Sequence, residues 1–341
     1  MHPIETQILA GIGILSLAAT VFLVGRLRRR TKKPRQLGPY ALGDKVGQGA
    51  MGEVYRAWHT MLHRWCAIKL LSGNVTESDV RRFENEVRLT AQLSHPNTVS
   101  IYDFGRADDG TFYYAMELLD GVTLQQLVDA EGPQTPSRVI HILEQLCAAL
   151  REAHDAGLIH RDIKPDNIVL CRRGGVADVA KLLDFGLVAQ VAASTNTDLV
   201  VGTPLYLSPE AIAAPNNVSA RSDLYALGAV AYFLLTGTPV FHGTSVVEVC
   251  SQHLYADPQP LPHVAADLER IVLDCLSKDP LERPTSAADL AQRLAGCSDA
   301  RSWNLSSKAL PRSRSDRDRM VDSGLVRPAP SARESLFCAA A

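Results

Sequence analysis

The stretch from His160 to Asn167 reads His-Arg-Asp-Ile-Lys-Pro-Asp-Asn and guides the interpretation of the whole chain. It places an aspartate (Asp162), a lysine (Lys164) and an asparagine (Asn167) in one short segment. These side chains offer a proton acceptor, a cation and a neutral oxygen donor, which suit phosphoryl transfer. That reaction depends mainly on positioning a hydroxyl, neutralising phosphate charge and holding magnesium. A bare His-Arg-Asp also occurs in capped turns, so the flanking sequence has to decide.

A second acidic group follows in the flank. An Asp-Phe-Gly sequence begins at Asp184, seventeen residues after Asn167. Between them, residues 171–175 read as the turn of a hairpin that joins residues 168–170 to residues 180–183. Such a hairpin would bring Asn167 and Asp184 together as two candidate ligands of a metal ion.

With these motifs the chain resembles the eukaryotic-type (Hanks-type) protein kinases. Lys164 is similar to the serine/threonine branch, and residues 153–157 are similar to bacterial members. The resemblance implies an α+β, two-lobed fold. A small antiparallel β lobe would carry one main helix, and a larger lobe would be mostly helical. It also implies that Asp162 accepts the proton of the substrate hydroxyl, that Lys164 faces the transferring phosphate, and that Asn167 and Asp184 hold Mg²⁺.

Length and composition limit the remaining possibilities. The 341 residues suffice for one large or two medium domains with appendages. The formal charge of -2 produces no overall field that favours nucleic acid, so we expect no nucleic-acid partner. The seven cysteines are scattered singly, which argues against a zinc site or a disulfide framework and indicates a reducing compartment.

Residues 1–37 are expected to form a separate unit. Thr6 to Gly25 contains no charged residue, and residues 8–24 are almost wholly apolar. About 20 such residues span a bilayer, so we expect one transmembrane helix, with a buried core helix as the alternative. The basic residues follow the apolar run, whereas a cleaved signal peptide has them before it. They are Arg26, Arg28, Arg29, Arg30, Lys32, Lys33 and Arg35. The positive-inside rule then predicts a single-pass protein of the cell (inner) membrane with its catalytic domain in the cytoplasm.

The catalytic domain is expected at residues 38–297 and opens with a Gly-x-Gly-x-x-Gly-x-Val loop. Dinucleotide-binding folds show a similar glycine spacing, but the apolar alternation that follows favours a hairpin over a helix. Glycines allow the backbone to approach the phosphates of a nucleotide closely. The nucleotide-binding residues expected in this loop are Val46, Gly47, Gln48, Gly49, Ala50, Met51, Gly52, Glu53 and Val54.

Lys69 lies in a buried-strand pattern, where an unpaired lysine is costly. Its expected partner is Glu86 in the following helix, and Glu84 is the rival candidate. Glu86 is preferred because the inward side of its helix would also hold three residues at helical spacing. These are Phe83, Val87 and Thr90. The resemblance implies that Lys69 orients the α and β phosphates of ATP and that Glu86 holds Lys69.

Two further strands, at residues 100–105 and 112–118, would complete the small lobe. The resemblance places the hinge between the lobes at Met116, Glu117 and Leu118. The main chain of Glu117 and Leu118 would bind the adenine edge, Met116 would be the gatekeeper, and Ala67 would line the nucleotide site.

Apolar residues at helical spacing predict the helices of the larger lobe, at residues 123–129, 137–156 and 224–235. The resemblance implies that Asp223, at the start of the third helix, braces the catalytic loop from behind. It also implies that Arg283 pairs with Glu210. Ser208 stands where the family usually has alanine, which is a conservative departure.

Two polar segments remain. Residues 298–341 are expected to be a disordered tail, since Ser306 to Arg333 is rich in Ser, Arg, Asp and Pro. The segment after Asp184 carries hydroxyl residues at Ser194, Thr195, Thr197 and Thr203. The first three are candidates for autophosphorylation, in which the phosphate would meet Arg161. Autophosphorylation in trans would make a second copy of the chain a partner.

The activity expected from these features is transfer of the γ-phosphate of ATP to Ser/Thr hydroxyls of protein substrates, with Mg²⁺. The alternatives are a pseudokinase scaffold that binds nucleotide without turnover and a small-molecule phosphotransferase of related fold. The motif residues named above are all present, which favours an enzyme. The glycine-rich loop, together with Ser208-Pro209-Glu210 and its distant arginine, favours protein substrates.

Overall fold

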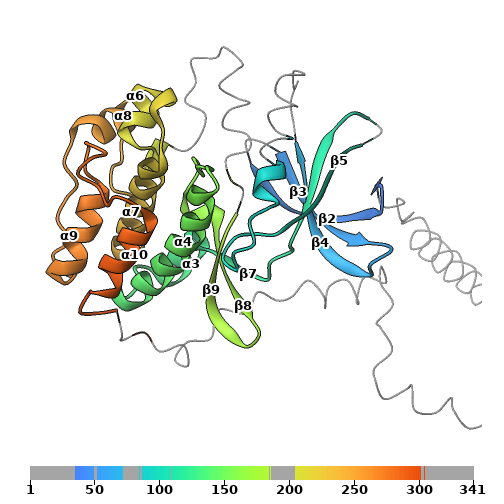
Figure 1. Cartoon of the computed structure of the whole chain (residues 1–341), viewed down its shortest axis with the longest axis horizontal. Helices are drawn as coiled ribbons and strands as arrows, with labels where there is room; N and C mark the ends of the chain where they lie inside the picture. The colour runs from blue at the N-terminus through green and yellow to red at the C-terminus, as the bar shows by residue number, and fades with distance from the viewer. Residues whose placement is uncertain are drawn as a thin grey trace, which may run out of the picture.

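The computed structural model describes residues 35–49, 52–71, 84, 87–107, 109–183, 185, 204–300 and 303. These residues form two lobes, one built on a six-stranded antiparallel sheet and the other mostly helical with its own three-stranded sheet. Figure 1 shows the sheet lobe on the right and the helical lobe on the left. The predicted two-lobed α+β architecture is confirmed.

The strands of the first lobe follow the order β1-β2-β3-β4-β6-β5, and every neighbouring pair is antiparallel. Strand β6 ends two residues before the predicted end of its strand, because the chain leaves the sheet after Met116 to form the hinge. The strands are β1 (Gln36–Leu37), β2 (Tyr40–Gly49), β3 (Gly52–His59), β4 (Arg64–Leu71), β5 (Ile101–Arg106) and β6 (Phe112–Met116).

The helix predicted between the fourth and fifth strands is described only in part. Glu84 and residues 87–90 are helical, and Val87 and Thr90 are buried, as their predicted inward side requires. Phe83 and Glu86 lie outside the described residues.

The second lobe begins with a small sheet in the order β7-β8-β9. Its strands are β7 (Gly121–Thr123), β8 (Ile168–Arg173) and β9 (Val176–Leu182). The predicted hairpin is present, but residues 171–173 belong to β8 and not to its turn. Gly174 and Gly175 make the turn alone, because both adopt positive φ angles of 54° and 85°.

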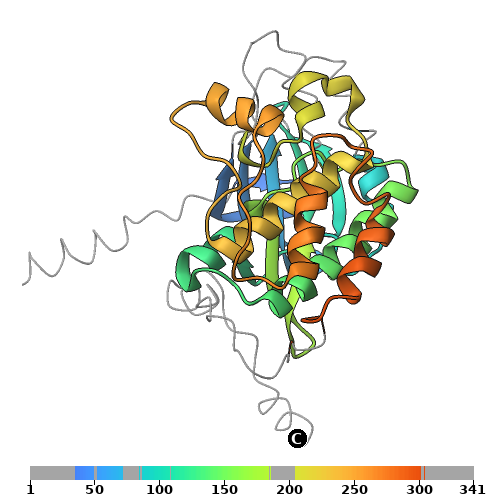
Figure 2. The same cartoon turned by 90° about the vertical axis from the view of Figure 1, so that its left-hand side faces the viewer.

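The helices of this lobe pack around α7, whose residues from Ser222 to Leu234 are all buried. A Cβ atom at Gly228 would lie 2.5 Å from the Cβ of Cys275, so glycine permits α7 and α9 to meet closely. Figure 2 looks onto this lobe and shows α9 and α10 (orange and red) side by side. The helices are α3 (Leu124–Glu131), α4 (Pro136–Asp155), α6 (Pro209–Ala213), α7 (Ala220–Thr236), α8 (Val246–Tyr255), α9 (Ala266–Cys275) and α10 (Ala287–Ala295).

One predicted helix start differs from the structure. Helix α7 begins at Ala220, because Ser219 caps it by accepting a hydrogen bond from the backbone of Arg221. Asp223 therefore lies inside the first turn of α7 and not at its start.

Both ends of the folded region extend beyond the expected boundaries. Leu37 in β1 is buried in the core with Tyr40 and Leu42, so the first lobe includes residues before 38. Beyond residue 297, the ring of Trp303 stacks on the guanidinium of Arg138 at 5.3 Å. The predicted transmembrane segment and the rest of the predicted tail lie outside the described residues. Within the described part of the chain, no helix combines the length and the apolar character needed to cross a membrane.

Candidate active site

Two side chains of the loop between α4 and β8, those of Lys164 and Asn167, converge on the carboxylate of Asp162. The Lys164 Nζ atom lies 2.8 Å from each carboxylate oxygen of Asp162. The Asn167 Nδ2 atom donates to the main-chain oxygen of Asp162 at 2.8 Å and to its Oδ2 at 2.7 Å. A single turn of 3₁₀-helix (Pro165–Asn167) holds these residues at the required spacing. The cation and the oxygen donor expected from the sequence therefore both lie within hydrogen-bonding distance of the expected base, Asp162.

Asp223 supports this loop from the core of the helical lobe. Its buried carboxylate accepts hydrogen bonds from the main-chain N–H of His160 at 2.8 Å and of Arg161 at 2.9 Å. The Nε2 atom of His154, on α4, lies 2.8 Å from the same carboxylate. Arg161 has a φ of 66°, a conformation that costs energy in a residue other than glycine. The hydrogen bonds of Asp223 hold the backbone in this conformation immediately before Asp162.

His160 connects the loop to the end of β9. Its buried ring accepts the main-chain N–H of Asp162 at Nδ1 (3.2 Å), so the ring proton resides on Nε2, which donates to Leu183 O at 2.7 Å. The ring also lies 4.7 Å, centroid to centroid, from that of Phe185. His160 thus fixes the position of Asp162 relative to the residues on either side of Asp184.

The β8–β9 hairpin returns the chain to Asn167, one of the two expected metal ligands. The main-chain N–H of Leu183 donates to Asn167 O at 2.8 Å, so the residue before Asp184 lies beside Asn167. Asp184 itself lies outside the described residues. The Nδ2 atom of Asn167 donates to Asp162, so the Oδ1 atom lies on the opposite side of the amide group. An amide oxygen is a ligand of the kind that Mg²⁺ prefers.

The glycine-rich loop is a β2–β3 hairpin and not the start of a helix. Gly47 pairs with Val54, Gln48 with Glu53, and Gly49 with Gly52. A Cβ atom at Gly52 would lie 2.0 Å from the main-chain oxygen of Leu70, so only glycine allows β3 to pass this close to β4. Ala50 and Met51, at the tip, lie outside the described residues.

The side chain of Glu53 is engaged on the surface of the sheet. It accepts hydrogen bonds from Lys45 Nζ and Tyr55 Oη, each at 2.7 Å, and these bonds lower the pKa of its carboxyl group. Glu53 is therefore expected to serve the nucleotide through its main chain.

Several residues expected at the nucleotide meet in one apolar cluster between the lobes. Ala67 and Met116 are buried in this cluster, and Val54, Leu118 and Leu183 pack against it. Strand pairing produces this convergence, because Ala67 lies opposite Met116 in the β4–β6 ladder. The cluster could enclose the apolar faces of an adenine ring.

Lys69 emerges from β4 beside this cluster, opposite Val54 on β3 and Tyr114 on β6. Its Nζ atom lies 5.9 Å from the centre of the Tyr114 ring. The rival partner, Glu84, pairs instead with Arg88 at 3.8 Å on the exposed side of its helix. Because Glu86 is outside the described residues, its pairing with Lys69 stays a prediction.

A buried ion pair behind the hinge was not foreseen from the sequence. The Nζ atom of Lys181, on β9, lies 2.9 Å from Glu117 Oε2, and Arg173 also pairs with this carboxylate. Lys181 donates to Thr98 O at 3.1 Å, and burial lowers its pKa. The signal in the sequence is a single lysine in the apolar run from Val179 to Leu183. The pair ties the hinge to the strand that leads to Asp184.

The predicted pair of Glu210 and Arg283 is present in the helical lobe. Arg283 donates to both carboxylate oxygens of Glu210, at 2.7 and 2.8 Å, and Ser222 Oγ donates at 2.6 Å. Burial alone would raise the pKa of Glu210, but these hydrogen bonds outweigh burial and lower it. Ser208 accepts the N–H of Ala211 at 3.3 Å as the cap of α6, a bond that alanine could not make.

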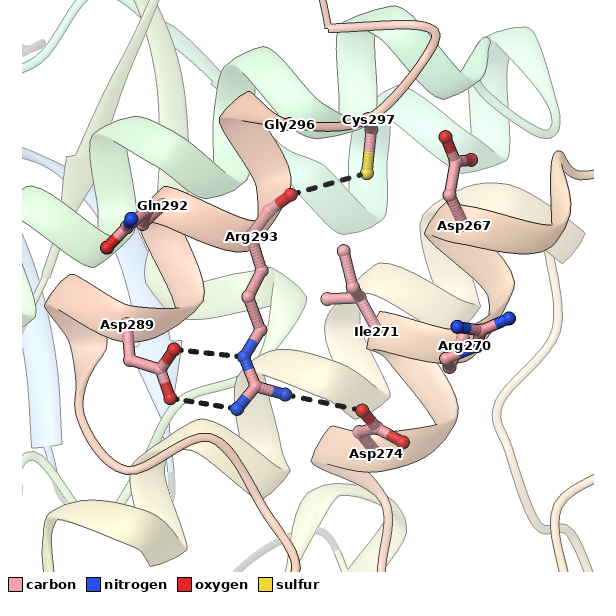
Figure 3. Close-up of a pocket in the computed structure, with 9 residues that line it drawn as sticks. All are labelled: Asp267, Arg270, Ile271, Asp274, Asp289, Gln292, Arg293, Gly296 and Cys297. Atoms are coloured by element: carbon pink, nitrogen blue, oxygen red, sulfur yellow. Dashed lines mark hydrogen bonds and ion pairs between the residues drawn. The ribbon is translucent and has the colours of Figure 1, made fainter.

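A surface pocket between α9 and α10 is lined by charged residues but contains none of the catalytic loop (Figure 3). Arg293 occupies its centre and is held by Asp289 at 2.9 Å and Asp274 at 3.3 Å. Asp267, on the rim, accepts the main-chain N–H of Ser298 at 2.8 Å. These bonds join α9 to the end of the folded chain, which is a structural role.

Comparison with known proteins assigns the family. The family described as "Protein kinase domain" matches residues 40–294, and the chain belongs to it. Serine/threonine-protein kinase pkn3 of Myxococcus xanthus is 38% identical over 263 residues, covering 73% of this chain and 48% of that protein. Serine/threonine-protein kinase PknB of Mycobacterium tuberculosis is 42% identical over 264 residues, covering 74% and 41%. The chain thus spans about half or less of the length of these relatives.

Solved structures support the same fold. The PknI kinase domain of Mycobacterium tuberculosis aligns with a TM-score of 0.61 at 27% identity, covering 77% of this chain and 97% of that one. Rad53 residues 1–466, in complex with AMP-PNP, align with a TM-score of 0.64 at 25% identity, covering 75% and 64%. The two-lobed architecture described above is therefore that of a protein kinase.

Proposed function

We propose that this protein is a serine/threonine protein kinase that transfers the γ-phosphate of ATP to hydroxyl groups of protein substrates. The observation that carries the proposal is the convergence of Lys164 and Asn167 on the carboxylate of Asp162, in a loop braced by buried Asp223. This geometry presents one carboxylate in a fixed orientation, with positive charge within one hydrogen bond of it. Such preorganisation is the main contribution that a protein makes to phosphoryl transfer.

In the proposed reaction Asp162 accepts the proton of the substrate hydroxyl. At the same time, the oxygen of that hydroxyl attacks the γ-phosphorus. The bond between this phosphorus and the β–γ bridging oxygen breaks, and ADP leaves. Lys164 lies 2.8 Å from the base and is placed to meet negative charge on the transferring phosphoryl group. Mg²⁺, when bound by Asn167 and Asp184, supplies charge neutralisation at the phosphates.

The remaining site residues are proposed to bind ATP. The β2–β3 hairpin, residues 46–54, would cover the phosphates, and Lys69 held by Glu86 would orient the α and β phosphates. Ala67 and the main chain of Glu117 and Leu118 would enclose the adenine. The apolar cluster of Ala67, Met116 and Leu118 supports this placement.

A phosphotransfer assay tests the proposal against its two alternatives. Purified protein is incubated with ATP and Mg²⁺, together with either a generic protein rich in Ser and Thr or a panel of small hydroxyl compounds. Transfer to the protein alone supports the protein kinase. Transfer only to small compounds would indicate a small-molecule phosphotransferase, and nucleotide binding without any transfer would indicate a pseudokinase scaffold.

We further propose that residues 1–34 anchor the protein in the cell (inner) membrane by one transmembrane helix, with the kinase domain in the cytoplasm. The apolar run and the basic cluster after it support this arrangement. The folded domain would begin at β1, and the segment after Trp303 would form a disordered tail. Deletion of residues 1–34 retains β1 and should give a soluble, active kinase. Recovery of the full-length chain in the soluble fraction without detergent would contradict the anchor.

A further inference from the structure

The turn between β3 and β4 exposes two consecutive apolar side chains. Met61 is 80% exposed and Leu62 is 60% exposed. The backbone of this turn is fixed, because the N–H of His63 donates to His59 O at 2.9 Å and the N–H of Leu62 donates to His59 Nδ1 at 3.1 Å. A well-defined turn thus presents apolar surface that the fold itself does not bury. Such surface marks an interaction site when its neighbours point to a partner.

The point where the chain enters the domain lies beside this turn. Thr60 donates to Pro39 O through its N–H at 2.9 Å and through its Oγ1 at 3.0 Å. Strand β1 is separated from β3 only by β2, a distance of about 10 Å at ordinary strand spacing. The turn and β1 accordingly lie on the side of the sheet lobe remote from the helical lobe (Figure 1).

The sequence before the domain limits how far this surface can lie from a bilayer. Ten residues, 25–34, separate the apolar run from Arg35, and six of them are basic. Ten residues span at most about 35 Å. The tether that we propose therefore keeps Arg35, just before β1, within about 35 Å of the end of the membrane span, and the β3–β4 turn lies beside β1.

The chemistry around the turn is suited to an anionic bilayer. Arg64 follows the turn, and its guanidinium stacks 3.9 Å from the centre of the Tyr102 ring, which is itself partly exposed. The rings of Trp58 and Trp65 pack edge to face at the base of the turn, 5.0 Å apart. Apolar side chains beside cations and aromatic rings are typical of surfaces that enter the interfacial layer of a membrane.

The position of the turn leaves the nucleotide loop accessible. His59 and Gly52 are at opposite ends of β3, about 24 Å apart at the rise of a strand. A membrane at the β3–β4 turn is thus at the far end of the hairpin from the glycine-rich tip.

From these features we propose that the Thr60–His63 turn is a second membrane contact, in which Met61 and Leu62 enter the headgroup layer of an anionic bilayer and orient the kinase domain. The inference rests on the membrane anchor proposed above and adds a contact made by the folded domain. Its test must distinguish failure of the contact from failure of the anchor.

The experiment uses the full-length chain in vesicles of phosphatidylcholine with roughly one third phosphatidylserine, in vesicles of phosphatidylcholine alone, and in detergent. Co-sedimentation reports the anchor, and amide hydrogen exchange of residues 58–66 reports the contact. We expect exchange in anionic vesicles to be slower than in detergent by about 10-fold, with less protection in neutral vesicles. The M61E/L62E variant should lose this protection and still co-sediment.

A matched variant controls for the added charges. V247E/Y255E also replaces two exposed apolar residues, 77% and 81% exposed on α8 of the other lobe, and should leave the exchange of residues 58–66 unchanged. Equal exchange in vesicles and detergent, with co-sedimentation intact, would overturn the contact and leave the anchor standing. Protection that appears in detergent and grows with protein concentration would assign the turn to a second copy of the chain. Failure of the parent to co-sediment would overturn anchor and contact together.

Discussion

Asn167 donates its side-chain amide to Asp162 twice, to the main-chain oxygen at 2.8 Å and to the carboxylate at 2.7 Å. This pair links the proposed base directly to a proposed metal ligand. The amide nitrogen is committed to Asp162, which determines that the opposite atom, Oδ1, is the one available to a cation. The position of the base and the position of the metal are therefore coupled in one loop, and loss of the hydrogen bonds between these two residues should disturb both.

Substitution of the base tests the chemistry directly. Asp162→Asn preserves the shape of the side chain but removes its negative charge and its ability to accept a proton. We expect turnover to fall by about 10² or more while ATP binding is nearly unchanged. Steady-state kinetics and a nucleotide-binding titration measure the two effects separately. Full turnover in this variant would exclude Asp162 from the mechanism.

Asp223 should act through position and not through contact with substrate. Asp223→Ala leaves the N–H groups of His160 and Arg161 without their acceptor, and the loss at the buried His160 group costs about 1–3 kcal/mol. We expect a lower melting temperature and a reduced kcat, because Arg161 can then leave its strained conformation. Asp223→Asn keeps one acceptor oxygen and should recover part of both losses. If Asp223→Ala melts as the parent does and turns over normally, the bracing role is wrong.

The sequence predicted best the features that follow from local chemistry. The apolar alternation that follows the glycine-rich motif predicted a hairpin, and β2 and β3 do form one. Gly52 is a position where a Cβ atom would collide with β4. The glycine-containing turn at residues 171–175, between the apolar runs 168–170 and 180–183, predicted the β8–β9 hairpin. Helix α7 was predicted from its nearly continuous apolar composition, although Ser219 starts it earlier than expected.

Features that depend on long-range pairing could not be predicted from the residues alone. A lysine in a buried strand requires a charged partner, but the strand pattern does not indicate that the partner of Lys181 is Glu117, sixty-four residues earlier. The role of Ser208 as a helix cap depended on where α6 begins. The proximity of the β3–β4 turn to the entry of the chain depended on the pairing of β2 with β3, which places Tyr40 opposite His59.

The ion pair behind the hinge should contribute through its burial. Lys181→Met removes the cation 2.9 Å from Glu117 and leaves that carboxylate with only the partly exposed Arg173. Breaking a buried pair by removing one partner commonly costs about 3–5 kcal/mol, which denaturant unfolding would detect. The double variant Glu117→Gln with Lys181→Met should be more stable than Lys181→Met alone. Additive losses in this cycle would show that the two residues are not coupled.

Autophosphorylation is expected between Gln190 and Val201, a segment outside the described residues. A phosphate brings about -1.5 to -2 charge, and Arg161, next to the base, offers a permanent cation to receive it. Mass spectrometry after incubation with ATP should find phosphate on Ser194, Thr195 or Thr197 in the parent and not in Asp162→Asn. A fully active parent without phosphate in this segment would rule out this route of activation.

The pH dependence of stability should reveal His253, which is buried between α7 and the rest of the helical lobe. Its Nδ1 atom lies 2.8 Å from Tyr225 Oη, and its ring packs edge to face on Phe241 at 4.9 Å. Burial, aided by the nearby charge of Lys278, lowers the pKa of His253 from 6.5 to about 4. Between pH 6.5 and about pH 4, His253 is protonated in the unfolded chain but neutral in the folded chain. Stability from this group is therefore fully present above pH 6.5 and is lost as the pH falls toward 4.

The full loss corresponds to about 3 kcal/mol in the free energy of unfolding. Burial also lowers the pKa of His95 and His141, so these residues also make the folded chain less stable at low pH. The effect of His253 must therefore be measured as the difference between the parent and a variant at this position. His253→Gln does not titrate and retains polar groups that can bond to Tyr225. Urea unfolding at pH 7, 6 and 5 gives the free energy of unfolding of the parent and of this variant at each pH. We expect this free energy to fall more steeply with decreasing pH in the parent than in the variant. Parallel slopes would mean that His253 is protonated equally easily in the folded and unfolded chain and would overturn this prediction.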